Sequence, residues 1–198
     1  MILSRRHFLG AAAAGSAGLV APRAFAAVRS GDQPALLPRA LAALDTHGSH
    51  VRHRDVVGIV DFSAPSSAFR FHLVDVASGR TSTHLVAHGR GSDPANTGWA
   101  QKFSNRPGSN ASSLGSFVTA NAYYGKHGRS RRLNGLDPDN SNAASRAIVI
   151  HSASYVTRQM ARSQGRVGRS LGCFTVTRED LGEVMDRLGE GRLLFAAL

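Results

Sequence analysis

Short apolar runs broken by turns are the feature of this sequence that most constrains its fold. Residues 68–77 alternate apolar and polar side chains, Ser78-Gly79 makes a turn, and residues 81–87 return, which predicts a β-hairpin. Further strands are predicted at 56–60, 117–124, 147–150 and 192–198. The 21 glycines and seven prolines favour short strands over long helices. Because 198 residues suit one domain with one core, we expect a single-domain, mainly β fold with short helices, of the α+β class.

Three short helices are predicted around these strands. Residues 34–46 carry apolar side chains at helical spacing, and residues 155–164 form a second helix that Gly165 ends. A third helix follows Thr177, which is the expected N-cap. Between the strands, residues 88–110 are polar and glycine-rich, and a long ordered loop of this kind often carries function.

The first 26 residues have the order of an export signal. The pair Arg5-Arg6 precedes a weakly apolar run at 10–21, and Ala24-Phe25-Ala26 resembles a cleavage site. Adjacent arginines and weak hydrophobicity predict the twin-arginine route, with an ordinary secretion signal or an uncleaved anchor as the alternatives. We therefore expect a protein exported to the periplasm or cell envelope, with no stable membrane span after cleavage. Residues 27–55 then form a leader with a short amphipathic helix, and residues 56–198 form the main domain.

The chain is strongly basic. Its formal net charge is +11, and it falls to +8 without the signal, which holds three arginines and no acid. A basic exported protein meets anionic wall polymers, acidic peptides and lipid head groups. No recognition motif or basic helical face indicates nucleic acid as a partner. Nothing in the sequence demands an oligomer, and we expect a monomer.

Cys173 is the only cysteine, so the chain cannot form an internal disulfide. A free thiol in an oxidising compartment is either a buried, inert side chain or a nucleophile. It ends the segment Gly168-Arg169-Ser170-Leu171-Gly172-Cys173, whose glycines permit a sharp turn beside the sulfur. The backbone amides of Gly172 and Cys173 are the expected donors to an oxyanion. This setting favours the nucleophile.

A cysteine nucleophile needs a base, and His151 is the best candidate. It ends the apolar run at 147–150, where a strand would hold its side chain rigidly. Considered alone, a histidine there is more often a surface or core residue. Because Cys173 follows 22 residues later, after one helix and a return loop, we predict that His151 activates the thiol.

The sequence resembles the YkuD-type L,D-transpeptidase catalytic domains of murein synthesis. That family's signature is a His, a spacer and Ser/Thr-His-Gly-Cys, matched here by His151 and Ser170-Leu171-Gly172-Cys173. The match is to a branch with a bulky residue before Gly-Cys, and it extends from about residue 56 to the C-terminus. Other segments that resemble this branch are Val86-Ala87-His88-Gly89-Arg90, Lys102-Phe103-Ser104-Asn105, Ser112-Ser113-Leu114-Gly115, Gly125-Lys126-His127-Gly128 and Arg146-Ala147-Ile148-Val149-Ile150-His151.

The resemblance implies a β-sandwich of mixed sheets and a cysteine acyltransferase of the cell wall, with no cofactor and no metal. Cys173 would attack a tetrapeptide stem of peptidoglycan, and D-Ala would leave with a proton from His151. The amine of a second stem would resolve the thioacyl enzyme and give a 3→3 cross-link. A wall-linked protein is another conceivable acceptor, and water as acceptor would make the site an L,D-carboxypeptidase.

Two departures from the family bear on the remaining site residues. Leu171 stands where the wider family has a second histidine, and Thr175 stands where it tends to have an arginine. Arg169 and Arg166 could instead bind a substrate carboxylate. The weaker candidates are Ser170, which would hydrogen-bond within the cysteine loop or be a simple turn residue, and the substrate-binding candidates His88, His127 and Ser113. His88 and His127 either line the cleft or satisfy loop backbone.

Two other classes of function are the alternatives. A wall-binding module without catalysis would retain the basic surface, but binding alone requires no free thiol. A zinc peptidase would need a motif such as H-x-x-E-H or H-E-x-x-H, and neither occurs. His47, His50 and His53 have regular spacing but follow the first predicted helix without a nearby scaffold for zinc.

Overall fold

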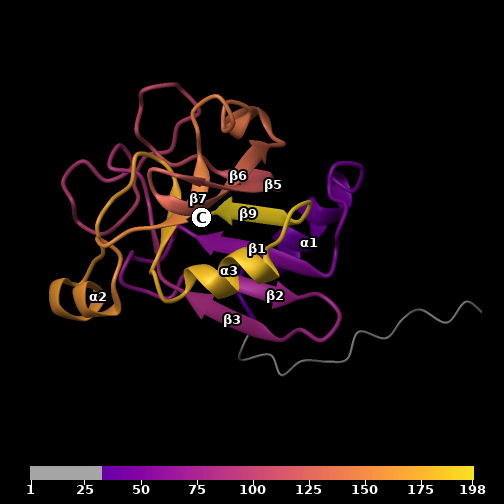
Figure 1. The fold of residues 1–198 in the computed structure, drawn as a ribbon, viewed down its shortest axis with the longest axis horizontal. Coiled ribbons are helices and arrows are strands. Elements are labelled where there is room, and N and C mark those ends of the chain that lie inside the picture. Colours follow the sequence, from indigo (N-terminus) through magenta and orange to yellow (C-terminus); the bar gives the residue numbers. More distant parts are fainter. Residues whose placement is uncertain (1–32) are drawn as a thin grey trace, which may run out of the picture.

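A computed structural model describes residues 33–198 (Figure 1), so the predicted export signal lies outside the described residues. This part of the chain forms nine strands, three α-helices and one 3-10 helix. The strands are β1 (Val56–Asp61), β2 (Phe71–Asp75), β3 (Thr81–His84), β4 (Val86–Ala87), β5 (Gly115–Gly125), β6 (Gly128–Gly135), β7 (Val149–Ser152), β8 (Phe174–Val176) and β9 (Leu193–Ala197). The helices are α1 (Leu37–Thr46), η1 (Pro138–Asn140), α2 (Arg158–Gln164) and α3 (Leu181–Arg187). The mainly β, single-domain fold is therefore confirmed.

All nine strands join one hydrogen-bonded sheet in the order β3-β2-β1-β9-β5-β6-β7-β8-β4. The strands at its two ends, β3 and β4, are neighbours in the chain, with only Leu85 between them. The sheet must therefore curl until its two ends nearly meet, so that its halves face each other as the layers of the expected sandwich would. The sheet is mixed, because β1 pairs with β9 and β7 pairs with β8 in parallel, and the other pairs are antiparallel.

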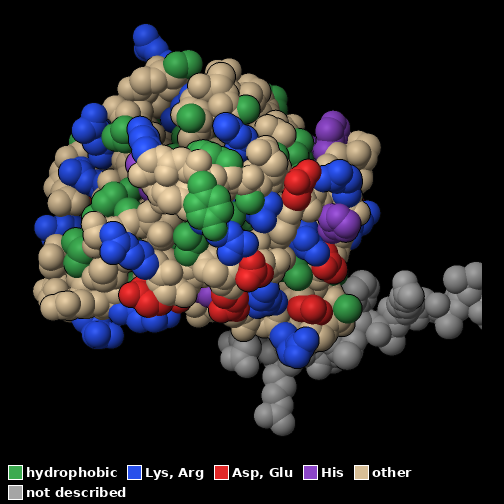
Figure 2. Space-filling model, in the orientation of Figure 1, with side chains coloured by type: hydrophobic (Ala, Val, Ile, Leu, Met, Phe, Trp, Pro, Cys, Tyr) green, Lys and Arg blue, Asp and Glu red, His purple; other side chains and the backbone are tan. Residues whose placement is uncertain are grey.

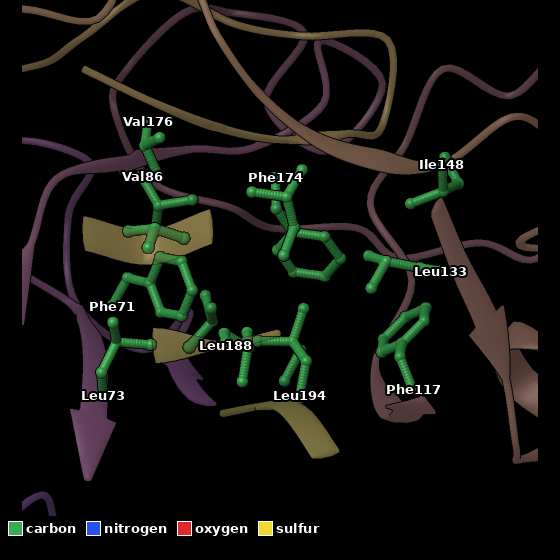
Figure 3. Close-up of a cluster of buried hydrophobic side chains, with 14 of the residues drawn as sticks. Phe71, Leu73, Val86, Phe117, Leu133, Ile148, Phe174, Val176, Leu188 and Leu194 are labelled. Atoms are coloured by element: carbon green, nitrogen blue, oxygen red, sulfur yellow. The ribbon is translucent and has the colours of Figure 1, made fainter. Parts of the chain in front are cut away.

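The alternation of β1 divides the apolar side chains between two layers. Val56 and Val60 join the main core inside the curled sheet, whereas Val57 and Ile59 join a second core on its outer face. The main core also contains Leu188 and Val184 from the α3 region, and Figure 3 shows side chains of this core converging. The second core is covered by α1, whose Leu37, Ala40 and Leu44 are buried. The amphipathic helix predicted at 34–46 is confirmed, and it packs as part of the same folded body.

The helices α2 and α3 begin later in the chain than predicted, at Arg158 instead of residue 155 and at Leu181 instead of directly after Thr177. Thr157 accepts the Met160 amide at the start of α2, and Gly165 ends it in the left-handed conformation, as expected. At α3 the Thr177 hydroxyl accepts the Asp180 amide at 3.0 Å, but the helix itself begins only at Leu181. The N-cap is therefore Asp180 and not Thr177.

The strand predictions differ from the structure in bounds and in number. The strands predicted at 68–77 and 147–150 are Phe71–Asp75 and Val149–Ser152, so His151 lies inside its strand and not after it. The predicted strand at 81–87 is two strands, because the chain bends at Leu85 and β4 leaves the hairpin to pair with β8. The strand β6 was not expected, since it is rich in arginine. Its Arg131 is nevertheless 6% exposed, and the guanidinium donates to the carbonyls of Ala120 and Met185, which satisfies part of the buried charge's hydrogen bonding.

The long polar segment between β4 and β5 is an ordered loop closed by backbone contacts. A Cβ atom on Gly89 would lie 2.2 Å from the Asn110 carbonyl oxygen, and one on Gly91 would lie 2.1 Å from that of Ser109. Only glycine allows the two ends of the loop to approach this closely. A β-bridge between Gly89 and Ser170 joins this loop to the segment that contains Cys173.

Basic side chains are spread over the face shown in Figure 2, with several acids along its lower part. In residues 33–198 no helix has the length and apolar character that a membrane crossing requires.

The burial of Phe117 in the main core leads to a prediction about stability. Phe117 is fully buried and its ring meets that of Phe174 edge-on, with 5.3 Å between centroids. Phe117→Ala is expected to reduce the free energy of unfolding by about 3–5 kcal/mol, because the cavity adds to the lost transfer energy. Chemical denaturation measures this change. Tyr124→Ala on the same strand is the control, since Tyr124 is 83% exposed and its loss should change the value by less than about 0.5 kcal/mol. Equal effects of the two changes would contradict the packing described.

Candidate active site

The parallel pairing of β7 and β8 places the predicted catalytic residues on one face of the sheet. Ile150 pairs with Phe174, and both side chains point into the main core. Because side chains alternate along a strand, the next pair, His151 and Thr175, points to the opposite face. Cys173 immediately precedes β8 and lies two residues from Thr175, on that same face. The pairing thus brings together two residues that are far apart in the sequence.

The loop before Cys173 is fixed by the hydroxyl of Ser170. This hydroxyl donates to the Cys173 carbonyl at 2.7 Å and accepts the Gly172 amide at 3.1 Å. The Ser170 backbone bonds to His88 and Arg90 of the long loop. The prediction that Ser170 hydrogen-bonds within the cysteine loop is confirmed in geometry.

The Gly172 amide does not face the cleft as an oxyanion donor, contrary to expectation. This amide donates to the Ser170 hydroxyl instead, and Gly172 adopts a φ of 117° at this turn. A Cβ atom here would lie 2.8 Å from the Ala111 carbonyl oxygen, so the position requires glycine. The Cys173 amide stays a prediction for this role.

The Cys173 thiol is half-buried and bonds to backbone. Its sulfur donates to the Ala147 carbonyl at 3.6 Å. Ala147 has a φ of 54°, a left-handed conformation that is costly for a residue with a Cβ atom and that is often found at functional sites. Burial raises the pKa of the Cys173 thiol, against a backbone hydrogen bond from Val149 and the positive charges of Arg146 and Lys126, which favour the thiolate.

His151 is held by hydrogen bonds at both ring nitrogens. Its Nδ1 lies 3.0 Å from the Ser152 carbonyl oxygen, which can only accept, so Nδ1 carries the proton. Its Nε2 lies 3.1 Å from the Thr175 hydroxyl, which donates to it when the ring is neutral. Burial lowers the pKa of His151, the Ser152 bond raises it, and His127 and Lys126 lower it. His151 thus rests as a neutral imidazole with its lone pair on Nε2.

His127 reaches the site from the tip of the β5–β6 hairpin. Gly125 pairs with Gly128, which leaves Lys126 and His127 as the two residues of the turn. The His127 ring stacks on that of His151, with 4.4 Å between centroids and 24° between planes. Since the hairpin depends on the unexpected strand β6, the stack could not be foreseen from the sequence.

These residues surround a cleft of about 420 Å³. Its lining consists of Tyr123, Lys126, His127, Arg146, Ala147, Val149, His151, Tyr155, Arg169, Ser170, Leu171 and Cys173. Three of them are cations and none is an acid, so the cleft suits a ligand that carries carboxylates. In the described part of the chain, no cluster of three or more His, Cys, Asp or Glu could hold a metal ion. His47 instead bonds to Asp137 at 3.0 Å.

Three of the weaker candidates lie outside the lining. His88 is fully buried, with Arg70 donating to Nδ1 at 2.9 Å and Asp93 lying 3.4 Å from Nε2. Burial and the charge of Arg70 lower the pKa of His88 to about 4. Its side chain therefore does not line the cleft, and the histidine supports the loop instead. Ser113 is also buried, and Arg166 bonds to the carbonyl of Gln164 at the end of α2.

The structure adds Arg146, Thr175 and Tyr155, which sequence reasoning did not single out. Arg146 donates to the hydroxyls of Ser113 and Ser109, and it also bonds to the carbonyls of Ser104 and Ala111. It therefore ties the long loop to the floor of the cleft beside Cys173. The only sequence signal for Thr175 was its place two residues after the cysteine, and none pointed to Tyr155.

Cys173 and His151 do not form a preformed ion pair. Among residues 33–198, no hydrogen bond joins the sulfur to the His151 ring, and the pKa shifts of both groups favour their neutral forms. A preformed pair would instead carry a thiolate at acidic pH. The expectation that His151 lowers the pKa of the resting thiol is therefore wrong, and proton transfer must accompany attack.

This resting state predicts how the thiol reacts with iodoacetamide. The rate at Cys173 should rise with pH and reach half its maximum above about 8.5, the usual pKa of a cysteine, because burial raises the pKa. Intact mass against time at each pH gives the rate, and Cys173→Ala serves as the blank. A plateau of reactivity between about pH 5 and 7, of the kind a thiolate–imidazolium pair gives, would contradict the neutral pair.

The chain is similar to solved structures and to a family model. The chain is similar to an L,D-transpeptidase from Mycobacterium smegmatis at 13% identity and a TM-score of 0.45, over 73% of this chain and 59% of that one. It is also similar to an L,D-transpeptidase from Xylanimonas cellulosilytica at 16% identity and a TM-score of 0.41, over 81% and 70%. L,D-transpeptidase 3 from Mycobacterium tuberculosis, solved with a faropenem-derived adduct, gives 13% identity and a TM-score of 0.45, over 73% and 60%.

The chain spans about three fifths of the length of the mycobacterial proteins. No curated protein sequence matches it. The family model described as an L,D-transpeptidase catalytic domain matches residues 30–197. Because this match takes in α1, every strand and the whole cleft, the chain belongs to the L,D-transpeptidase catalytic domain family.

Proposed function

We propose that the protein is a cell-wall L,D-transpeptidase with Cys173 as nucleophile and His151 as base. The observation that carries this proposal is the pairing of β7 with β8, which sets a free thiol and a neutral imidazole in one cleft. A neutral imidazole with a lone pair can accept a proton, whereas a protonated one cannot. The family supports a transpeptidase, and the substrate and the steps below are part of the proposal.

The donor is a tetrapeptide stem of peptidoglycan, cut before its terminal D-Ala. Cys173 forms a bond from sulfur to the carbonyl carbon, and its proton passes to His151 Nε2 as the Thr175 hydroxyl turns away from that nitrogen. The C–N bond then breaks, and His151 returns that proton to the amine of the departing D-Ala. A thioacyl enzyme remains, and the amine of a second stem resolves it to give a cross-link.

The charge of the cleft supports this donor. Such a stem bears a carboxylate at its C-terminus, and Lys126, Arg146 and Arg169 line the cleft without an opposing acid. Arg146 already donates to four groups of the long loop, which leaves Arg169 and Lys126 as the better partners for substrate. One nitrogen of Arg169 bonds to the carbonyls of Asp93 and Pro94, which holds the side chain at the rim.

The proposal extends to the cellular setting. Residues 1–26 have the pattern of a twin-arginine signal, which would deliver the protein to the periplasm or cell envelope, where peptidoglycan lies. There the basic chain would meet an anionic polymer. The protein would act as a monomer on stem peptides.

Intact mass spectrometry with a disaccharide-tetrapeptide tests the proposed chemistry. We expect a mass increase equal to the donor minus D-Ala, and we expect none in Cys173→Ala. His151→Ala should form the adduct at least about 100-fold more slowly, because the general base is lost. Adding an acceptor stem should discharge the adduct into a cross-linked product, whereas discharge by water alone would indicate a carboxypeptidase. A folded protein that forms no adduct and releases no D-Ala would contradict the proposal and favour a wall-binding module.

The role of Arg169 has its own test with a matched control. Arg169→Ala should raise the donor KM about 10-fold or more, because a charge-assisted hydrogen bond to a carboxylate contributes about 1.5–3 kcal/mol. Arg166→Ala removes the same charge three residues away, outside the cleft lining, and should leave KM within about twofold. Steady-state kinetics of D-Ala release measures both. An unchanged KM in Arg169→Ala would show that this arginine does not bind the donor.

A further inference from the structure

The residue that faces His151 across the β7–β8 pair is Thr175, and its hydroxyl is the middle of a chain of three side chains. The Thr175 hydroxyl lies 3.1 Å from His151 Nε2, and the Tyr155 hydroxyl lies 3.3 Å from that of Thr175. His151 and Thr175 are 2% and 0% exposed, so water does not compete for these bonds. The geometry at Nδ1 sets the direction of the chain.

Because Nδ1 donates to the Ser152 carbonyl, the neutral ring can only accept at Nε2. Thr175 has one hydroxyl proton and donates it to Nε2. Tyr155 must therefore donate its own hydroxyl proton to the Thr175 oxygen. The three groups therefore point one way, from Tyr155 through Thr175 to His151. When His151 takes a proton at Nε2, the same chain can reverse, with Nε2 donating to Thr175 and Thr175 donating to Tyr155.

Only a hydroxyl at position 175 serves both states, since it can donate to a lone pair or accept from an N–H. On reversal the Tyr155 oxygen accepts from Thr175, and the Tyr155 O–H, which keeps its proton, turns toward the cleft that Tyr155 lines. The position of Tyr155 is itself constrained. Gly168 donates its amide to the Tyr155 carbonyl at 2.7 Å, and a Cβ atom on Gly168 would lie 2.6 Å from that of Tyr155.

We propose that Thr175 and Tyr155 form a reversible hydrogen-bond chain that positions His151 in both of its protonation states and turns the Tyr155 hydroxyl toward the substrate when His151 is protonated. Thr175 is a positioning residue, since it acts through His151. This inference rests on the proposed function, in which His151 gains and returns one proton per acylation. It assigns a role to the residue that stands where the wider family tends to have an arginine.

Other charged and titratable groups lie around His151 and also affect its pKa. They come from the hairpin tip, the start of β8 and the segment before α2: Lys126, His127, Cys173 and Tyr155. Removal of the Thr175 hydroxyl alters none of these charges. A shift in the titration of His151 in Thr175→Val would therefore report the lost hydrogen bond.

Thr175→Val, which keeps the shape and removes the hydroxyl, is the main test, and Thr175→Ser restores the hydroxyl. For D-Ala release we expect Thr175→Val to lower kcat about 10–100-fold with the donor KM within about threefold. The acid limb of kcat/KM should move to lower pH, because the bond that the hydroxyl accepts from the charged imidazolium is stronger than the bond that it donates to the neutral ring. Thr175→Ser should lie within about threefold of the wild type, with its acid limb unmoved. Tyr155→Phe should lower kcat about 3–10-fold.

Nitrogen-15 NMR of the His151 ring gives a readout that needs no substrate. The wild-type ring should be the Nδ1–H tautomer, and its titration midpoint should be lower in Thr175→Val than in the wild type or in Thr175→Ser. His151→Gln identifies the resonances by their disappearance. If the wild type forms no thioacyl adduct, the proposed function fails, but the tautomer and the midpoint still decide whether the chain exists.

Thr119→Val is the control for simple loss of a buried hydroxyl. Thr119 is 2% exposed and bonds to the carbonyls of Gly189 and Arg192, outside the cleft lining. It should lose thermal stability without a change in kcat or in the His151 titration. A wild-type kcat and midpoint in Thr175→Val would overturn the proposal, as would equal losses in Thr175→Val and Thr175→Ser with no shift in midpoint. An unchanged kcat in Tyr155→Phe would overturn the role given to Tyr155.

Discussion

The parallel pairing of β7 with β8 is the constraint on which the active site depends. The pair is only three residues long, but Phe174 and Ile150 anchor it in the main core. Figure 3 shows Phe174 among the core side chains. Packing on one face therefore fixes the spacing of chemistry on the other. Any slip of one residue would turn His151 into the core and Ile150 into the cleft. The same strand register is therefore needed for the core packing and for the geometry of the cleft.

The neutral state of the site follows from burial. Taking Cys173 and His151 out of water disfavours a charge on either group, and the cations at Arg146 and Lys126 offset this only in part for the thiol. The enzyme that results keeps a thiol of low reactivity at rest. Attack then requires the proton to move as the substrate binds, so reactivity is confined to a correctly placed carbonyl. If the protein is exported to an oxidising compartment, as proposed, a neutral thiol is also protected from oxidation.

The sequence was sufficient to predict the β class and the helix at 34–46, and it singled out Cys173 and His151, which the structure places in one cleft. Alternation, capping and a short motif are read from neighbours along the chain. The sequence was not sufficient to predict strand β6. Its Arg131 can be buried only because its guanidinium donates to backbone carbonyls of other segments. The same limit applies to Thr175, Tyr155 and the stacked His127. Their roles depend on strand register and on a hairpin turn, neither of which a single sequence displays.

A crystal structure of Cys173→Ala with a bound tetrapeptide stem would test the central claim most directly. The variant removes the nucleophile, so the donor would remain uncut in the cleft. The account predicts that the carbonyl before D-Ala lies against residue 173, on the same side as His151, with a stem carboxylate beside Arg169. A stem bound elsewhere on the surface, or one whose carbonyl points away from residue 173, would contradict it.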